Sequence, residues 1–351
     1  MKLSEFDYNL PEERIAKFPP EIRGTTNLMV LDRGDSSIVH RKYSDIVEYI
    51  KPGDILVLNN TKVEKVRVFF TNQTNSKRIE ALFLNKVYRG GDLNTEYWEC
   101  ILGRAKNVRE GDILVSVESD GEIKVEGRIE DSIFLVTASI GVIDSIFEKE
   151  GHVPLPPYLR REDTKEDYVR YNTVFAKKTG SSAAPTSGLN FTPQMLELLK
   201  NKGVEIVEVS LNVGWGTFAP IRVDEIEKHK IHSEYIEVTQ EVADKINDVI
   251  SNRGDVWALG TTAARTLESV AESTEDGFRV KAFKGDTSIY IYPGYQWKVV
   301  KHLITNFHAP KSSLLVMIAS LLGYDFMMDA YKEALEKEYN FLSYGDSMII
   351  L

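Results

Sequence analysis

The stretch DILVLNNTKVEKVRVFF, residues 54–70, marks a change of architecture along the chain. Its first half, DILVLNN, is a short and continuous apolar run, which is typical of a buried strand in a parallel sheet. Its second half contains VRVFF, the first of several short β segments that are separated by turn residues. The stretch therefore predicts the point at which an α/β domain gives way to an all-β unit.

Before this stretch, strands and helices alternate. NLMVLDR, residues 27–33, predicts a strand, and PEERIAK, residues 11–17, predicts a helix. SDIVEYI, residues 44–50, predicts a second helix, which begins at Ser44 and ends near Gly53. This alternation is typical of an α/β domain.

After it, the chain continues as short β segments up to about residue 139. They are RIEALFL (78–84), YWECIL (97–102), ILVSV (113–117), IKVEGRI (123–129) and IFLVTA (133–138). No helical period of useful length interrupts them, so the sequence predicts a small barrel or sandwich.

The alternation resumes after residue 150. The predicted strands are VEIVEVS (204–210), DVWALG (255–260), SIYIY (288–292), HLITNF (302–307) and DSMIIL (346–351), and helices follow several of them. We therefore expect an α/β fold in which residues 1–62 and 151–351 form a larger, discontinuous domain with a mostly parallel sheet. Residues 63–150 are expected to form an inserted, barrel-like β domain.

Composition limits the class of protein. A net charge of -10 makes a broadly basic nucleic-acid surface improbable, although a local basic groove remains compatible with it. The single cysteine, Cys100, lies in an apolar strand-like segment, which favours a buried inert thiol. No run approaches the ~18 apolar residues of a membrane helix, and no signal-peptide core is present. We expect a cytoplasmic, enzyme-sized monomer without a membrane partner.

The stretch TGSSAAPTSGLNFT, residues 179–192, consists mostly of small side chains. A flexible linker is one interpretation. However, the stretch ends in Thr192-Pro193, a helix start, and the helix that follows ends at Gly203. Because Gly180 and Gly188 allow a ligand to approach the main chain, a binding loop is the other interpretation.

Two further segments follow predicted strands, where ligands bind in α/β sheets. DVWALGTTAARTLESV places Gly260, Thr261 and Thr262 at a turn, with Arg265 in the first helical turn; an ordinary capped helix with a surface arginine is the alternative. HLITNFHAPKSSLL contains three polar side chains between two buried elements. These side chains are Asn306, His308 and Lys311, and helix capping with routine packing and solvation is the alternative.

Two weaker candidates are also loops. SLNVGWGTFAPI places Gly214 and Gly216 around an aromatic residue and before Thr217, which suits a planar base, although glycine also marks bulges. FLSYGDSMIIL contains Tyr344 and Asp346 in a turn that a plain tight turn would also explain.

Several other site classes lack their motifs. The six histidines form no H-E-x-x-H pattern and have no cysteine partners, so we expect no metal site. Neither G-x-S-x-G nor G-x-x-x-x-G-K-[ST] occurs, which removes the motif case for an α/β-hydrolase or a P-loop NTPase. His229 and His232 lie close together in EIEKHKIHSEYIEV, where a solvated surface is the ordinary interpretation.

Taken together, these segments resemble one family over the whole chain. The matching segments are LPEERIAKFPPEIR, GDILVLNNTKV, VPLPPYLRR, RYNTVFAKKTGSSAAPTSGLNFT, LNVGWGTFAPI, HKIHSEY, LGTTAARTLES, YPGYQWKVVKHLITNFHAPKSSLL and FLSYGDSMII. Their order and spacing resemble the S-adenosylmethionine:tRNA ribosyltransferase-isomerases of queuosine biosynthesis. The resemblance is weakest in the β segment.

The resemblance implies that the ribosyl moiety of S-adenosylmethionine is transferred to 7-aminomethyl-7-deazaguanine (preQ1) at the wobble position of tRNA and isomerised there. The implied products are epoxyqueuosine-tRNA, adenine and methionine. S-Adenosylmethionine would be a consumed substrate, with no permanently bound cofactor and no metal. The implied fold is an α/β domain with an inserted β-barrel.

With this reaction in view, the candidate residues take provisional roles. Expected to contact the substrates are Gly180, Ala184, Thr186, Gly188, Asn190, Phe191, Asn212, Gly214, Gly216, Thr217, Gly260, Thr261, Thr262, Arg265 and Asn306. Expected to act in catalysis, through orientation, proton transfer or phosphate contact, are His308, Lys311, Tyr344 and Asp346. Expected to contact tRNA are Arg160, Arg161, Arg170 and His232.

Two positions depart from the family pattern. Asn190 and Asn212 stand where the pattern has histidine. Asparagine can make one of the hydrogen bonds of histidine, but it cannot accept and return a proton near neutral pH. Two alternatives therefore stay open: a paralogue that acts on another nucleoside, and a non-catalytic protein that binds adenosine-containing ligands or RNA.

Overall fold

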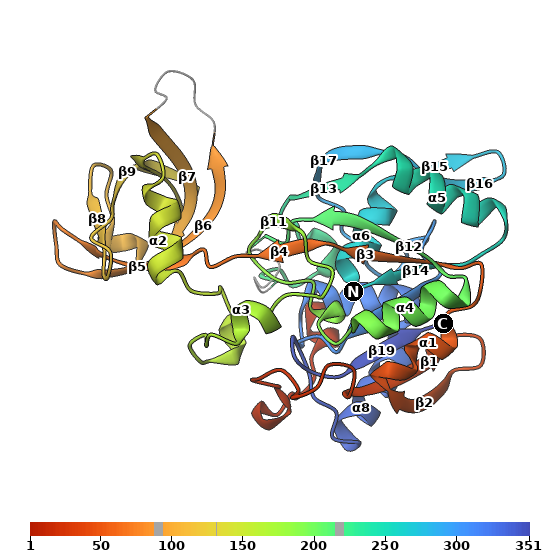
Figure 1. Ribbon diagram of the computed structural model, residues 1–351. Helices are drawn as coiled ribbons and strands as arrows, with labels where there is room; N and C mark the ends of the chain where they lie inside the picture. The colour runs from red at the N-terminus through yellow and green to blue at the C-terminus, as the bar shows by residue number, and fades with distance from the viewer. Residues whose placement is uncertain (88–93, 131, 215–220) are drawn as a thin grey trace.

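The computed structural model describes residues 1–87, 94–130, 132–214 and 221–351. It consists of a large α/β part and a separate small β-barrel (Figure 1). The chain enters the barrel after β4 (Thr61–Val63) and leaves it after α2 (Val142–Glu150), so the barrel is inserted into the α/β part. The predicted fold class is confirmed. The domain boundaries at residues 63 and 150 stay a prediction.

The α/β part is built on one long sheet. Its strands, in spatial order, are β17 (Phe283–Thr287), β13 (Glu234–Val238), β12 (Glu205–Leu211), β3 (Ile55–Asn59), β14 (Val256–Leu259), β18 (His302–Asn306), β19 (Ser347–Ile350), β1 (Asn27–Asp32) and β2 (Ser37–Lys42). The central strands β12, β3, β14 and β18 pair in parallel, and so do β19 and β1. The other joins, β17 to β13, β13 to β12, β18 to β19 and β1 to β2, are antiparallel.

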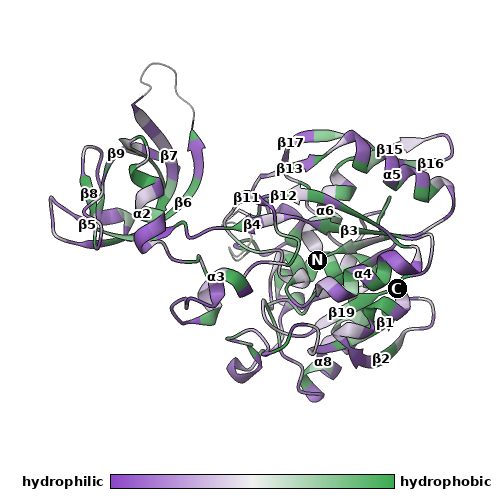
Figure 2. Ribbon diagram, in the orientation of Figure 1, coloured by the Kyte–Doolittle hydropathy of each residue, from purple (hydrophilic) through white to green (hydrophobic). Residues whose placement is uncertain are grey.

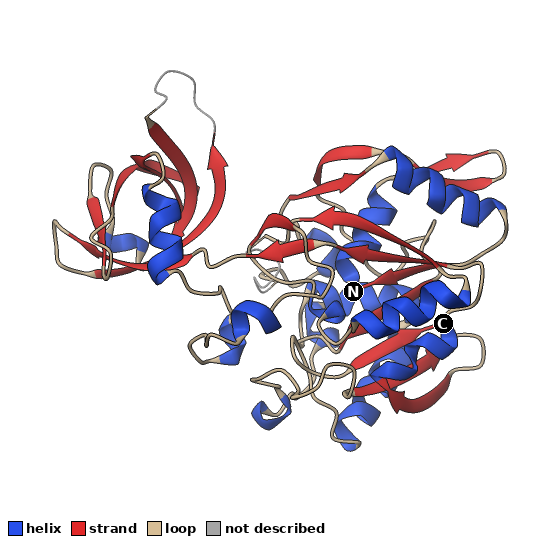
Figure 3. Ribbon diagram, viewed as in Figure 1, coloured by secondary structure: helices blue, strands red, loops and turns tan. Residues whose placement is uncertain are grey.

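Helices cover both faces of this sheet (Figure 3). One face packs against α5 (Gln240–Ser251), α6 (Thr261–Ser269), α7 (Ser313–Leu322) and α8 (Tyr324–Glu336), and the other against α1 (Ile46–Tyr49) and α4 (Pro193–Lys202). In β3, Ile55 and Val57 join the first core, whereas Leu56 and Leu58 join the second. Burial on both faces explains why these strands are continuous apolar runs, green in Figure 2, rather than alternating ones.

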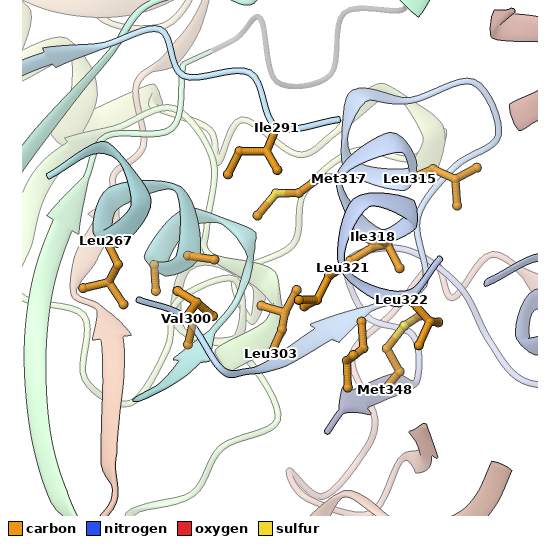
Figure 4. Close-up of a cluster of buried hydrophobic side chains, with 14 of the residues drawn as sticks. Leu267, Ile291, Val300, Leu303, Leu315, Met317, Ile318, Leu321, Leu322 and Met348 are labelled. Atoms are coloured by element: carbon orange, nitrogen blue, oxygen red, sulfur yellow. The ribbon is translucent and has the colours of Figure 1, made fainter. Parts of the chain in front are cut away.

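The larger core holds α6 and α7 against the sheet (Figure 4). Leu267 of α6, Leu303 of β18 and Ile318 of α7 are fully buried there. Buried side chains that are closely packed have one well-defined arrangement. The N-terminal ends of α6 and α7, which matter for the site, are therefore anchored by apolar contacts behind them.

The barrel closes in the order β10 (Ile133–Ser139), β7 (Thr95–Leu102), β6 (Arg78–Val87), β5 (Arg67–Asn72), β8 (Ile113–Ser116) and β9 (Glu122–Glu130). Helix α2, which the sequence patterns did not predict, packs Ile143 and Ile146 into the barrel core. Cys100 is fully buried in the same core, and burial raises the pKa of its thiol. The thiol is therefore protonated, as the expected inert cysteine should be.

Two helix starts are capped by side-chain hydroxyls, and the one at Thr192-Pro193 confirms the prediction. The hydroxyl of Thr192 accepts a hydrogen bond from the main-chain N–H of Met195 at 3.2 Å, and α4 ends at Gly203 with a φ of 90°. The hydroxyl of Ser312 likewise accepts from the N–H of Leu315 at 3.2 Å and begins α7. Short polar side chains at these positions satisfy N–H groups that the helix itself leaves free.

Two predictions of secondary structure are wrong. Residues 288–292 form no strand; the edge strand β17 lies just before them, and Ile291 is instead buried in the core. The aromatic side chains of this segment pack against each other, since the rings of Tyr290 and Tyr292 lie 5.2 Å apart. PEERIAK forms only a short 3-10 turn, Glu12–Arg14, because Ile15 is drawn into a bridge with Phe341.

The remaining elements are short. They are β11 (Lys178–Ser181), β15 (Ala271–Thr274), β16 (Gly277–Val280), α3 (Asp167–Arg170) and the 3-10 turns Leu3–Phe6, Tyr43–Asp45, Ala105–Asn107, Pro157–Leu159, Thr186–Gly188 and Ile226–Lys228. β11 pairs in parallel with β4, and β15 pairs with β16. Among the described residues no single helix is long and apolar enough to cross a membrane, and α7 and α8 qualify only as a pair bent by 116°.

Candidate active site

A cavity of about 360 Å³ lies beyond the carboxyl ends of β14 and β18. This is the edge at which open α/β sheets bind ligands. The cavity brings together eight of the residues selected from the sequence, which come from three separate segments. They are Ala184, Thr186, Gly260, Thr261, Thr262, Asn306, His308 and Lys311.

The small-residue stretch forms one wall of this cavity and is firmly held. The hydroxyl of Thr186 donates to Oδ1 of Asn306 at 3.0 Å, and the hydroxyl of Tyr43 donates to the carbonyl oxygen of Ser187 at 2.5 Å. Ser187 is itself buried. These contacts exclude the linker interpretation and leave the binding-loop interpretation in place.

Gly188 allows close packing of neighbouring side chains and not the approach of a ligand. A Cβ atom at this position would lie 2.7 Å from Cζ of Phe175 and 3.0 Å from Cγ2 of Thr173. Asn190 and Phe191, which follow it, are buried at 2% and 0% exposure and do not line the cavity. The ring of Phe191 contacts that of Tyr43 in the core behind the loop.

His308 lines the cavity as a neutral imidazole. Burial lowers its pKa from 6.5 to about 3. Its Nε2 atom lies 3.0 Å from the hydroxyl of Thr305, and its main-chain N–H donates to the hydroxyl of Tyr331 at 3.0 Å. Among the described residues Nδ1 has no partner, so this nitrogen remains for a ligand. Such a ring can make one hydrogen bond to a substrate, but it binds a proton weakly near pH 7.

Lys311 lies on the rim of the same cavity. Its Nζ atom is 2.5 Å from Oδ2 of Asp7, and its main-chain N–H donates to the carbonyl oxygen of Phe6. The residue has a φ of 56°, a left-handed conformation that is unusual outside glycine. The N-terminal segment of the chain therefore fixes the turn that carries the lysine.

Helix α6 reaches the cavity with its N-terminus. Gly260 has a φ of 92° and a ψ of 156°, a conformation that only glycine adopts readily, and no side chain caps the helix. Arg265, one turn further along, forms a buried ion pair with Glu234 of β13. The second carboxylate oxygen of Glu234 accepts from the N–H of Gly214 at 3.1 Å.

Tyr344 and Asp346 lie outside the cavity wall. Asp346 accepts hydrogen bonds from the main-chain N–H groups of Asn27 at 2.6 Å and Asn340 at 2.7 Å, and burial raises the pKa of its carboxyl group. The hydroxyl of Tyr344 donates to Asp167 at 2.8 Å. Both side chains thus tie loops together in the structure.

A second cavity, also of about 360 Å³, separates the barrel from the sheet. Four of the predicted residues line it, namely Gly180, Asn212, Gly214 and His232. The wall also carries carboxylates that the sequence reasoning did not select: Glu99 and Glu130 from the barrel, and Glu234 and Asp286 from the sheet. Val213 lines both this cavity and the first one, so the two are neighbours.

A third cavity, of about 740 Å³, is rich in arginine. Arg160 and Arg161, for which we expect contact with tRNA, line it together with Arg67 and Arg222, which the sequence patterns did not indicate. Nothing local in the sequence marks those two, because the fold brings them together from distant segments. Arg161 is held by two bonds of 2.7 Å to Asp167, and Arg170 lies elsewhere, where it donates to the carbonyl oxygen of Pro20.

Gly216 and Thr217, also selected from the sequence, lie outside the described residues. Within the described ranges, no group of three or more histidine, cysteine, aspartate or glutamate side chains has a geometry that could hold a metal ion.

Comparison with known proteins gives one consistent result. The model of a family described as "Queuosine biosynthesis protein" matches residues 3–350. The chain is 43% identical over 351 residues to the S-adenosylmethionine:tRNA ribosyltransferase-isomerase of Thermotoga maritima, and 42% identical over 354 residues to that of Desulfitobacterium hafniense. Both alignments cover the whole of each chain.

A solved structure gives the same answer. The chain is similar to the crystal structure of an S-adenosylmethionine tRNA ribosyltransferase from Thermotoga maritima, with a TM-score of 0.55 and 33% identity. The match covers 99% of this chain and 100% of that one.

Proposed function

Because the chain belongs to the queuosine biosynthesis protein family, we propose that it is an S-adenosylmethionine:tRNA ribosyltransferase-isomerase. It transfers the ribosyl moiety of S-adenosylmethionine to preQ1 at the wobble position of tRNA, with release of adenine and methionine. The observation that carries this proposal is the full-length family match, together with a cavity at the sheet edge built from the matching segments.

The reaction sets clear demands on a site. The sulfonium makes the neighbouring ribose C5′ acidic, so a group must accept a proton from this carbon. Adenine must leave, and an epoxide must form without interception by water. Such a site needs positioned groups and shelter from solvent more than it needs a strong nucleophile.

The first cavity suits S-adenosylmethionine. Its wall combines apolar groups such as Pro185, Val213 and Leu314 with the hydroxyls and amides of the three loops. Binding sites for small molecules have this character, in which an apolar lining buries the ligand and a few polar groups orient it. We assign His308, through Nδ1, to orienting the ribosyl group or the adenine.

The second cavity suits the preQ1 base. The aminomethyl group of preQ1 is a cation at neutral pH, and Glu99, Glu130 and Asp286 supply carboxylates there. Because Val213 lines both cavities, a base in the second would lie next to a ribosyl group in the first. We assign Asn212 and Gly214 to the base on this ground.

Transfer RNA requires cationic groups, although the net charge of the protein is -10. The arginine-rich cavity beside the barrel provides them locally, from Arg160, Arg161, Arg67 and Arg222. Phosphate contacts of this kind position a nucleic acid without reading its sequence. We assign this surface to the backbone of the anticodon arm.

Tyr344 and Asp346 act as positioning residues in this proposal. Asp346 fixes the turn between Asn340 and β19, next to Asn306 of the cavity wall. Lys311, which does reach the cavity, is the remaining candidate for contact with a charged part of a substrate.

A second candidate function is a protein that binds S-adenosylmethionine without turning it over. Asn212 favours it, because this amide stands at the second cavity where the family pattern has an imidazole. Asn190 does not favour it to the same degree, because its side chain is buried away from the first cavity.

Adenine release separates the two candidates. The purified protein is incubated with S-adenosylmethionine and tRNA that carries preQ1, and adenine is followed by chromatography. We expect adenine in proportion to tRNA, and none with tRNA that has unmodified guanine at the wobble position. Binding of S-adenosylmethionine without adenine release would support the second candidate instead.

A further inference from the structure

Helix α6 presents several hydrogen-bond donors that have no acceptor. The first intrahelical bond runs from the N–H of Ala264 to the carbonyl oxygen of Gly260. The N–H groups of Thr261 and Thr262 precede it and have no acceptor among the described residues, and no side chain caps the helix. Both residues line the first cavity.

Two side chains of the same helix are also unsatisfied. The hydroxyl oxygen of Thr262 is buried without a hydrogen-bond partner, in a residue that is only 9% exposed and lines the cavity. Arg265, at 4% exposure, pairs with Glu234 through Nη1 only, while its Nε and Nη2 atoms are buried and have no partner. Buried donors without acceptors are rare in folded proteins.

These donors lie on one side of the helix. Residues three and four apart are neighbours on a helix surface, so Arg265 lies beside both Thr261 and Thr262. Arg265 lines a small cavity of about 20 Å³, and Leu314 lines both this cavity and the first one. The unpaired edge of the guanidinium, Nε and Nη2, has the spacing that matches two oxygens of one carboxylate.

We propose that the N-terminal half of α6 binds the α-carboxylate of the methionine moiety of S-adenosylmethionine. The inference rests on the proposed function and adds to it the orientation of the substrate. The carboxylate accepts from the N–H groups and hydroxyl at the start of α6 and from the free edge of Arg265. The rest of the molecule then occupies the first cavity, which Asn306 and His308 also line.

Charge favours a carboxylate over other anions. Glu234 already balances Arg265, so the site offers a helix N-terminus and a neutralised guanidinium, which suit one negative charge better than the two of a phosphate. None of the described residues that line the first cavity is an aspartate or glutamate. The described wall of the first cavity therefore offers hydrogen-bond donors for the acid group but no carboxylate for the ammonium or sulfonium group.

The test compares two ligands by calorimetry. One is S-adenosylmethionine, and the other is its decarboxylated form, which keeps the adenosine, sulfonium and amine. We expect the wild-type protein to bind the first about 100-fold more tightly, as several hydrogen bonds to one charged group would give. Equal affinities would overturn the proposal.

Substitutions in α6 test which side chains cause the difference in affinity between the two ligands. Thr262→Val should weaken binding of S-adenosylmethionine about tenfold and leave the decarboxylated ligand within about twofold, whereas Thr262→Ser should restore the wild-type ratio. The double variant Arg265→Gln with Glu234→Gln, which keeps the buried pair neutral, should lose most of the discrimination. Variants that weaken both ligands equally would show that the donors serve only the fold.

The adenine-release assay distinguishes failure of this inference from failure of the proposed function. If the protein releases adenine yet does not discriminate between the ligands, the carboxylate site is wrong and the proposed function stands. If it neither binds S-adenosylmethionine nor releases adenine, both are overturned. If the double variant does not fold, the two Thr262 variants and the comparison of the two ligands on the wild-type protein still test whether α6 binds the carboxylate.

Discussion

His308 makes a prediction about stability as a function of pH. The imidazole is buried with its Nε2 atom 3.0 Å from the hydroxyl of Thr305, and burial lowers its pKa from 6.5 to about 3. The folded protein therefore binds the proton less readily than the unfolded chain. The stabilising contribution is complete above pH 6.5 and is lost progressively as the pH falls from 6.5 toward 3.

The size of the effect follows from the difference in pKa. Within that window each pH unit corresponds to about 1.36 kcal/mol, so lowering the pH from 6.5 to 5 removes ~2 kcal/mol of unfolding free energy. His308→Gln removes the titrating group but keeps a neutral side chain that can bond to Thr305. The variant should therefore lose ~2 kcal/mol less than the wild type between pH 7 and pH 5.

Urea unfolding at pH 7 and pH 5 measures this difference directly. Since other groups titrate in both proteins, the quantity of interest is the wild-type loss minus the loss in the variant. Ring signals of His308 in an NMR titration provide a second readout and should not shift between pH 8 and pH 5. Equal losses in the two proteins, or a His308 titration midpoint near 6, would refute the neutral buried imidazole.

Three further predictions follow from single contacts. Glu268 accepts four hydrogen bonds of 2.9–3.0 Å around residues 295–300, so Glu268→Gln should lower the unfolding free energy by ~2–3 kcal/mol in urea, whereas Glu272→Gln, on the surface, should leave the midpoint unchanged. Asn190→His should keep the rate of adenine release within about twofold of wild type, because this side chain does not reach the cavity; a faster enzyme would show otherwise. Arg160→Ala should weaken tRNA binding and make the slope of log affinity against log salt shallower by about 1, and an unchanged slope would remove Arg160 from the tRNA surface.

Local patterns predicted much of this fold because they report on local physics. The apolar run at β3, the helix start at Thr192 and the turn before α6 each depend on residues within a few positions. The position of the first cavity could also be predicted from the sequence, because β14 and β18 are adjacent parallel strands whose carboxyl ends meet at one edge of the sheet.

Long-range features were beyond such patterns. Asp346 has the sequence setting of a site residue, but its carboxylate accepts from Asn27, far away in the chain. Arg67 reaches the arginine-rich cavity only because the barrel is placed beside residues 154–162. The segment 288–292 has the composition of a strand, yet the sheet ends at β17 and Ile291 packs into the core instead.

The fate of the ribose tests the central claim most directly. S-Adenosylmethionine labelled with ¹³C in the ribose is incubated with the protein and preQ1-containing tRNA, and the tRNA nucleosides are analysed by mass spectrometry. We predict that the five labelled carbons appear in the wobble nucleoside, in equal amount to the adenine released. Label that stays with adenosine, or a transferred methyl group instead of a ribosyl group, would contradict the proposed function.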